Sequence, residues 1–101
     1  MDTAFQLFKE HQLANFPEAY RGIEVKGIHL VMLDADTAGC IDAFYGKSGK
    51  GKALDRKRHE ILSRCRTELK IVIGELQGYP REYFQRLLVI CDAVLLELQK
   101  N

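Results

Sequence analysis

The chain has 101 residues, of which 47% are hydrophobic and 29% are charged, and its formal net charge at pH 7 is +1. This length suits one domain, so we treat 1–101 as a single unit, and the composition is that of a folded protein rather than a disordered one. No stretch approaches the ~18 uncharged apolar residues of a transmembrane helix, and no segment resembles a signal peptide. We therefore expect a cytoplasmic protein with no membrane partner.

The charge is unevenly distributed along the chain. Residues 1–46 carry seven acids and three bases, a net charge of −4, whereas residues 47–70 carry nine bases and three acids, a net charge of +6. A protein polarised in this way can steer a charged partner even though its total charge is close to zero.

The first helix is predicted to begin at Thr3. Thr3 can cap a helix, and Gln6, three residues later, supplies the reciprocal member of a capping box. Asn15 and Pro17 are expected to end this helix. One further helical turn is predicted over residues 17–21, with proline at its start.

The next segment, residues 23–45, admits two interpretations. Its beginning is rich in Val and Ile, which favours a strand, but the alternation of apolar residues breaks at Lys26 and Gly27. From Leu30 onward apolar residues recur at three- and four-residue spacing, which favours a helix. We predict a helix from about 28 to 45 and keep a strand near 23–33 as the alternative. Gly39 inside the helix costs about 1 kcal/mol relative to alanine, which suggests close approach of a neighbouring helix.

Residues 46–52 read GKSGKGK, and this composition predicts a flexible, solvated loop. The loop does not match the phosphate-binding pattern GxxxxGK[ST], because Ile41 stands where that pattern needs its first glycine. Nucleotide hydrolysis is therefore not expected.

Two long helices are predicted to follow the loop. One apolar face runs from Leu54 to Leu76 with Gly78 as a terminator, and a second begins at Tyr79 and Pro80. The short connection implies that these helices are antiparallel. The predicted fold class is all-α, an antiparallel bundle of about four helices, and α+β is the alternative.

No catalytic or metal-binding constellation is visible. Cys40, Cys65 and Cys91 lie on or beside apolar faces without a CxxC motif, so we expect reduced, inert thiols. The three histidines are far apart in the chain and none has a ligand-like spacing. These patterns predict no metal, no cofactor and no enzymatic activity.

Three carboxylates interrupt the apolar segment that contains the second helix: Asp34, Asp36 and Asp42. A buried carboxylate costs several kcal/mol unless it is paired, so each needs a partner or a solvated face. Asp34 is expected to pair with an Arg or Lys of the helix that follows the loop, such as Arg58 or Arg64. For function, we predict that these three aspartates form an acidic surface that binds a basic protein partner.

A basic segment offers an alternative function. Its cations can neutralise nucleic-acid phosphates and release counterions: Lys47, Lys50, Lys52, Arg56, Lys57 and Arg58. Aromatic residues for base stacking are missing between Gly46 and Gly78, so nucleic-acid binding stays second to protein binding.

The string LVMLDADTAGCIDAF from Leu30 to Phe44, followed by ILSRC and then REYFQRL, resembles a group of small bacterial helical proteins of unassigned function. That group is associated with immunity proteins, which neutralise a toxin made by the same or a sister cell. The resemblance implies a single helical domain with a protein partner and no cofactor. Many nuclease inhibitors are strongly acidic overall, so here the acidic part, 1–46, would have to form the binding face. The apolar faces of the second and fourth helices would also suit a homo-oligomer.

Overall fold

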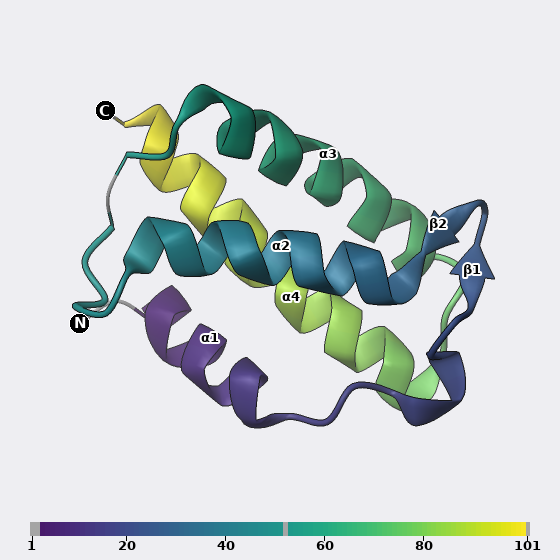
Figure 1. The fold of residues 1–101 in the computed structure, drawn as a ribbon. Helices are drawn as coiled ribbons and strands as arrows, with labels where there is room; N and C mark the ends of the chain where they lie inside the picture. Colours follow the sequence, from purple (N-terminus) through teal and green to yellow (C-terminus); the bar gives the residue numbers. More distant parts are fainter. Residues whose placement is uncertain (1–2, 52, 101) are drawn as a thin grey trace.

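The computed structural model describes residues 3–51 and 53–100, and in these residues it forms a bundle of four α-helices, as predicted. A single turn of 3-10 helix, labelled η1, and a two-stranded sheet join the first two helices (Figure 1). In chain order the elements are α1 (Thr3–Leu13), η1 (Glu18–Tyr20), β1 (Glu24–Val25), β2 (Ile28–His29), α2 (Leu30–Tyr45), α3 (Arg56–Ile73) and α4 (Gly78–Gln99).

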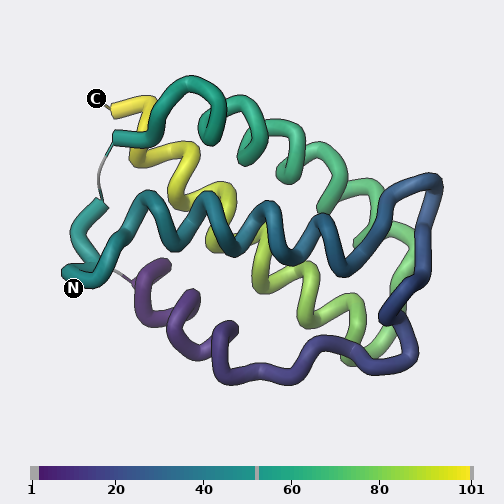
Figure 2. Tube along the Cα trace, viewed as in Figure 1, coloured from purple at the N-terminus to yellow at the C-terminus, as the bar shows by residue number. Residues whose placement is uncertain are grey.

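Helix α4 is the centre of the bundle, because it packs against each of the other three helices. Figure 1 shows α2 lying across α4, with α1 on one side and α3 on the other. The short connection over residues 74–77 makes α3 and α4 antiparallel, which confirms the prediction. Figure 2 shows residues 14–29 passing from α1 around the beginning of α4 to the beginning of α2.

The ambiguous segment contains both predicted kinds of structure. β1 and β2 form a short antiparallel hairpin in which Glu24 pairs with His29. Its two turn residues, Lys26 and Gly27, have φ values of 53° and 79°, and two consecutive positive φ angles are typical of the tight turns that join hairpin strands. The break in the apolar alternation therefore marks a turn. Helix α2 begins at Leu30, two residues later than predicted, and the Nδ1 atom of His29 accepts a hydrogen bond from the backbone of Met32 at 3.4 Å.

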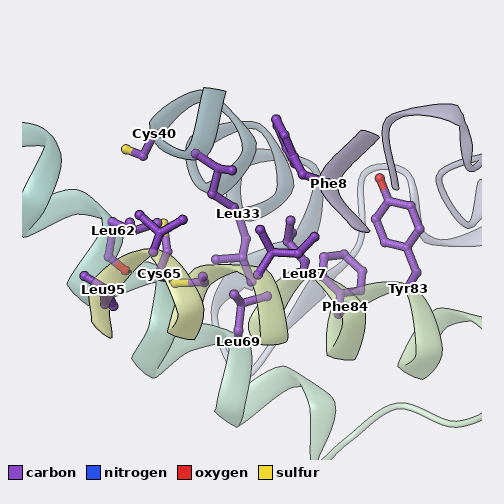
Figure 3. Packing of buried hydrophobic residues seen from close by; sticks show 14 of the residues in the cluster. Phe8, Leu33, Cys40, Leu62, Cys65, Leu69, Tyr83, Phe84, Leu87 and Leu95 are labelled. Carbon is purple, nitrogen blue, oxygen red and sulfur yellow. Dashed lines mark hydrogen bonds between the residues drawn. The ribbon is translucent and has the colours of Figure 1, made fainter. Parts of the chain in front are cut away.

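The core lies between α2, α3 and α4, where the predicted apolar faces meet (Figure 3). Its fully enclosed members include Leu30, Ile41, Leu62, Leu69, Phe84 and Leu87. Helix α3 is shorter than its apolar face suggests, because Leu54 and Leu76 join the core from the adjoining loops. Gly78, predicted to end α3, is the first residue of α4 and has a φ of 64°.

The glycine-lysine loop is not simply solvated, as the sequence suggested. Gly49 is buried, and a Cβ atom built there would lie 2.4 Å from the ring of Phe5. A Cβ atom at Gly51 would lie 2.4 Å from the ring of Phe44. The loop therefore rests on two aromatic rings at positions where only glycine fits without a shift. Lys52 falls outside the described residues.

Candidate functional site

The three predicted site aspartates project to different parts of the molecule. Asp34 faces α4, where both of its carboxylate oxygens accept the hydroxyl hydrogen bond of Tyr83 at 3.1 Å. Asp36 faces α3 and forms an ion pair with Arg64 at 3.0 Å. Asp42 is exposed, with no side-chain partner among the residues that the structure describes. The structure therefore does not gather these three carboxylates into one acidic cluster.

The prediction that Asp34 pairs with a basic residue of α3, such as Arg58 or Arg64, is wrong. Arg58 and Arg64 bind other carboxylates, at 2.9 Å for Asp55 and 3.0 Å for Asp36. Asp34 instead lies on the side of α2 that faces α1 and α4, and its side chain is 22% exposed. The neighbours of the Asp34 carboxylate are therefore the hydroxyl of Tyr83 and the ring of His11, and not an arginine.

Asp34 belongs to a polar cluster that joins three helices. His11 of α1 is only 3% exposed, and its Nε2 atom lies 3.8 Å from Oδ1 of Asp34. Its Nδ1 atom accepts a hydrogen bond from Nε of Arg86 at 2.9 Å, and its ring centroid lies 4.3 Å from that of Tyr83. We call His11, Asp34, Tyr83 and Arg86 the His11 cluster. The Tyr83 hydroxyl and the Nε atom of Arg86 donate within the cluster, whereas Nε2 of His11 and one terminal guanidinium nitrogen of Arg86 are buried without a hydrogen-bond partner among the described residues.

Tyr83 is held as a neutral hydrogen-bond donor. Burial, and then the adjacent Asp34 carboxylate, raise the pKa of Tyr83 well above its ordinary value of about 10. A phenolate next to Asp34 would place two like charges in a half-buried site. Tyr83 therefore cannot serve as a base near neutral pH.

The exposed side of α2 is unusually poor in charge. Its exposed residues recur at three- and four-residue spacing and include one charged side chain: Met32, Ala35, Gly39, Asp42 and Ala43. We call these five residues the outer α2 face. Met32 is 55% exposed, although methionine usually packs inside a protein. The prediction that a neighbouring helix approaches Gly39 closely is wrong. No other described part of the chain lies within 4 Å of a Cβ atom built there.

A hollow of about 250 Å³ lies between this face and α3. It is lined by Ala35, Asp36, Gly39, Cys40, Arg58 and Ile61. This volume falls below the 300–1,000 Å³ typical of small-molecule pockets. The hollow suits one protruding side chain better than a cofactor, and it has both an acid and a base on its lining.

A larger groove of about 600 Å³ separates α3 from the end of α4. It is lined by His59, Ser63, Arg66, Thr67, Asp92, Leu95, Leu96 and Gln99. An ion pair between Arg66 and Asp92 joins its two walls. Because these charges already neutralise each other, the groove has no net preference for a charged ligand.

The basic residues of the alternative site lie in one region, but they are not equally available. Lys47, Lys50 and Lys57 are exposed, and Arg58 forms an ion pair with Asp55. The first turn of α3 contains no acid, although the helix dipole favours acids there. Arg56 pairs with Glu60 at 3.4 Å and Arg58 with Asp55, so Lys57 is the cation of this turn that has no ion pair among the described residues.

The cysteines behave as predicted, since all three are free and buried. Burial raises the pKa of each thiol, and for Cys91 it reaches about 12. Within the described residues, no three His, Cys, Asp or Glu side chains come together as metal ligands would. None of the described helices combines the length and apolarity needed to cross a membrane.

Sequence reasoning missed the His11 cluster, because its members are separated by up to 75 residues. One signal was present in α1, where His11 follows Phe8 by three residues and so shares its apolar face. Comparison with protein-family models, with curated proteins and with solved structures finds no match for this chain.

Proposed function

We propose that this chain is a protein-binding module whose outer α2 face docks a basic protein surface. The observation that carries the proposal is Gly39, a mid-helix glycine that costs about 1 kcal/mol although a Cβ atom built there would meet no other described part of the chain within 4 Å. Close approach by the backbone or side chain of a partner would use the space it leaves. The neighbouring hollow offers room for a side chain of that partner.

The charge of the site indicates the chemistry of the partner. Asp42 is the exposed carboxylate of the outer α2 face, and Asp36 lies at its edge with a side chain that is 37% exposed. Residues 1–46, which include this face, have a net charge of −4. A partner with lysine or arginine side chains would be attracted to this face, and opposite charge accelerates association more than it increases affinity.

Within this class, we propose an inhibitor of the immunity type, in which the partner is a toxin. Support comes from a face suited to a basic partner, and the α2 sequence is the part of the chain that led us to expect this class. The module acts by occupying the surface of its partner, without a cofactor and without catalysis of its own.

Co-purification with the product of the adjacent gene tests this function. We expect a stable complex and protection of cells that express both proteins. Asp42→Lys should lower the association rate several-fold at low salt, and the effect should shrink at high salt. Glu82→Lys, on the exposed side of α4, makes the same charge change elsewhere and should leave the rate almost unchanged. Absence of both a complex and protection contradicts the inhibitor proposal.

Binding of nucleic acid is the second candidate, and the exposed lysines of the loop and of the first turn of α3 favour it. Lys47, Lys50, Arg56 and Lys57 are all exposed, and Gly49 and Gly51 of the preceding loop lie against the rings of Phe5 and Phe44. A gel-shift series across salt concentrations tests it. Binding should weaken steeply as salt rises, and no shift at low salt rules it out.

A further inference from the structure

We propose that α1 is an acid-sensitive latch: protonation of His11 weakens the docking of α1 on α4 and uncovers the aromatic side chains beneath it. This inference is independent of the proposed function. It concerns how the bundle opens.

Helix α1 is attached by few buried side chains. Of its eleven residues, all of which are described, Phe8 and His11 are buried, and Ala4, Phe5 and Leu7 are partly buried against the core. Phe8 packs near the ring of Tyr45, with ring centroids 6.4 Å apart. The other buried side chain is an imidazole, so part of the docking energy of α1 depends on a group whose charge can change.

The hydrogen bond of His11 requires a neutral ring. Its Nδ1 atom accepts from Nε of Arg86, and an arginine nitrogen can only donate. Nδ1 therefore has no proton in the docked state. The proton of the neutral ring is on Nε2, which faces Asp34 at 3.8 Å.

Protonation of His11 would replace this hydrogen bond with a contact between two cations. The charged and titratable groups around the ring are Arg86 and Tyr83 from α4 and Asp34 from α2, and Arg21 acts electrostatically on Asp34 and Tyr83. Attraction to Asp34 opposes the effect. However, the guanidinium nitrogen lies closer, at 2.9 Å against 3.8 Å, and Asp34 already accepts from Tyr83.

Burial adds to the cost, because the ring is 3% exposed and an imidazolium there loses most of its hydration. In the released state the imidazole is solvated and no longer faces the guanidinium of Arg86. By linkage, a proton that binds the released state better than the docked state weakens the docking of α1 as the pH falls.

Release of α1 would uncover a defined surface. Tyr45 and Tyr83 are buried in the closed bundle, and each has a ring contact with a buried side chain of α1. The contacts among α2, α3 and α4 do not include α1, so the remaining three helices retain their shared core. The latch is therefore a local opening and not global unfolding.

Hydrogen exchange of the full-length protein between pH 7.5 and 5 tests the latch. After correction for intrinsic rates, we expect the opening equilibrium of amides 5–13 to rise as the pH falls, while amides 62–72 of α3 stay protected. A constant opening equilibrium for α1 across this range overturns the proposal.

Three variants separate His11 from general acid effects. His11→Gln retains an acceptor but cannot titrate, so α1 opening should lose its pH dependence. His59→Gln, an exposed histidine of α3, should leave that dependence intact. Arg86→Met removes the opposing cation and leaves Asp34, so acid should then strengthen docking. The original trend in Arg86→Met or in His11→Gln overturns the proposal.

The wild-type protein gives a further test if His11→Gln fails to fold. Nitrogen chemical shifts of the His11 ring report its protonation directly. We expect the ring to gain its second proton in parallel with the opening of α1. A doubly protonated ring with fully protected α1 amides overturns the latch.

Discussion

The contact between Gly51 and Phe44 predicts that Gly51→Ala destabilises the protein, although the same change in a solvated loop would stabilise it. In a solvated loop, Gly51→Ala would stabilise the protein by about 0.4–1 kcal/mol, because alanine reduces the freedom of the unfolded chain. In the structure, the new Cβ atom would lie 2.4 Å from Cζ of Phe44. Ordinary carbon–carbon contacts are about 3.5–4.0 Å, so the ring or the loop has to move by more than 1 Å.

The ring of Phe44 has little room to move. It is 1% exposed, and its centroid lies 5.0 Å from that of Tyr45. Overpacking of an enclosed site typically costs about 1–3 kcal/mol. We therefore expect Gly51→Ala to destabilise the protein by that amount and to lower Tm by roughly 4–8 °C for each kcal/mol.

Urea unfolding followed by circular dichroism at 222 nm measures the change. Gly39→Ala is the matched control, because the same chemical change on the exposed side of α2 meets no contact and should stabilise the protein by about 1 kcal/mol. In a Phe44→Leu background the cost of Gly51→Ala should fall by at least about 0.5 kcal/mol, since the smaller side chain leaves space. A neutral or stabilising Gly51→Ala in the wild-type background would refute the contact.

Three further predictions concern other parts of the bundle. Tyr83→Phe removes the donor to both oxygens of Asp34 and should destabilise the protein by about 1–2 kcal/mol in urea unfolding; an unchanged midpoint would contradict that hydrogen bond. Thiol titration with a disulfide reagent at pH 8 should modify the native protein slowly, and Cys91 last, because burial raises the pKa of Cys91 to about 12; prompt labelling of all three thiols would show that the core is open. Asp92→Asn breaks the ion pair with Arg66, in which both side chains are more than 40% exposed, so stability should fall by less than about 1 kcal/mol, and a larger loss would show that the pair is structurally essential.

The helices could be predicted from the sequence because their determinants are local. Three- and four-residue spacing of apolar residues in α3 and α4 defines one buried face on each, and a short connection requires these neighbours to be antiparallel. The burial of the three cysteines follows from the same spacing. The turn at Lys26 and Gly27 was visible as a break in alternation, but its type depends on φ angles that spacing does not define.

The candidate site depended on tertiary structure, because charged side chains choose partners across the bundle. Asp34 and Asp36 are two residues apart, yet their helix positions direct one to Tyr83 and the other to Arg64. The rotation of α2 about its axis decides this, and that rotation results from how three apolar faces pack together. The meeting of His11 with Arg86, and of the loop glycines with Phe5 and Phe44, likewise arises only when distant segments close around one core.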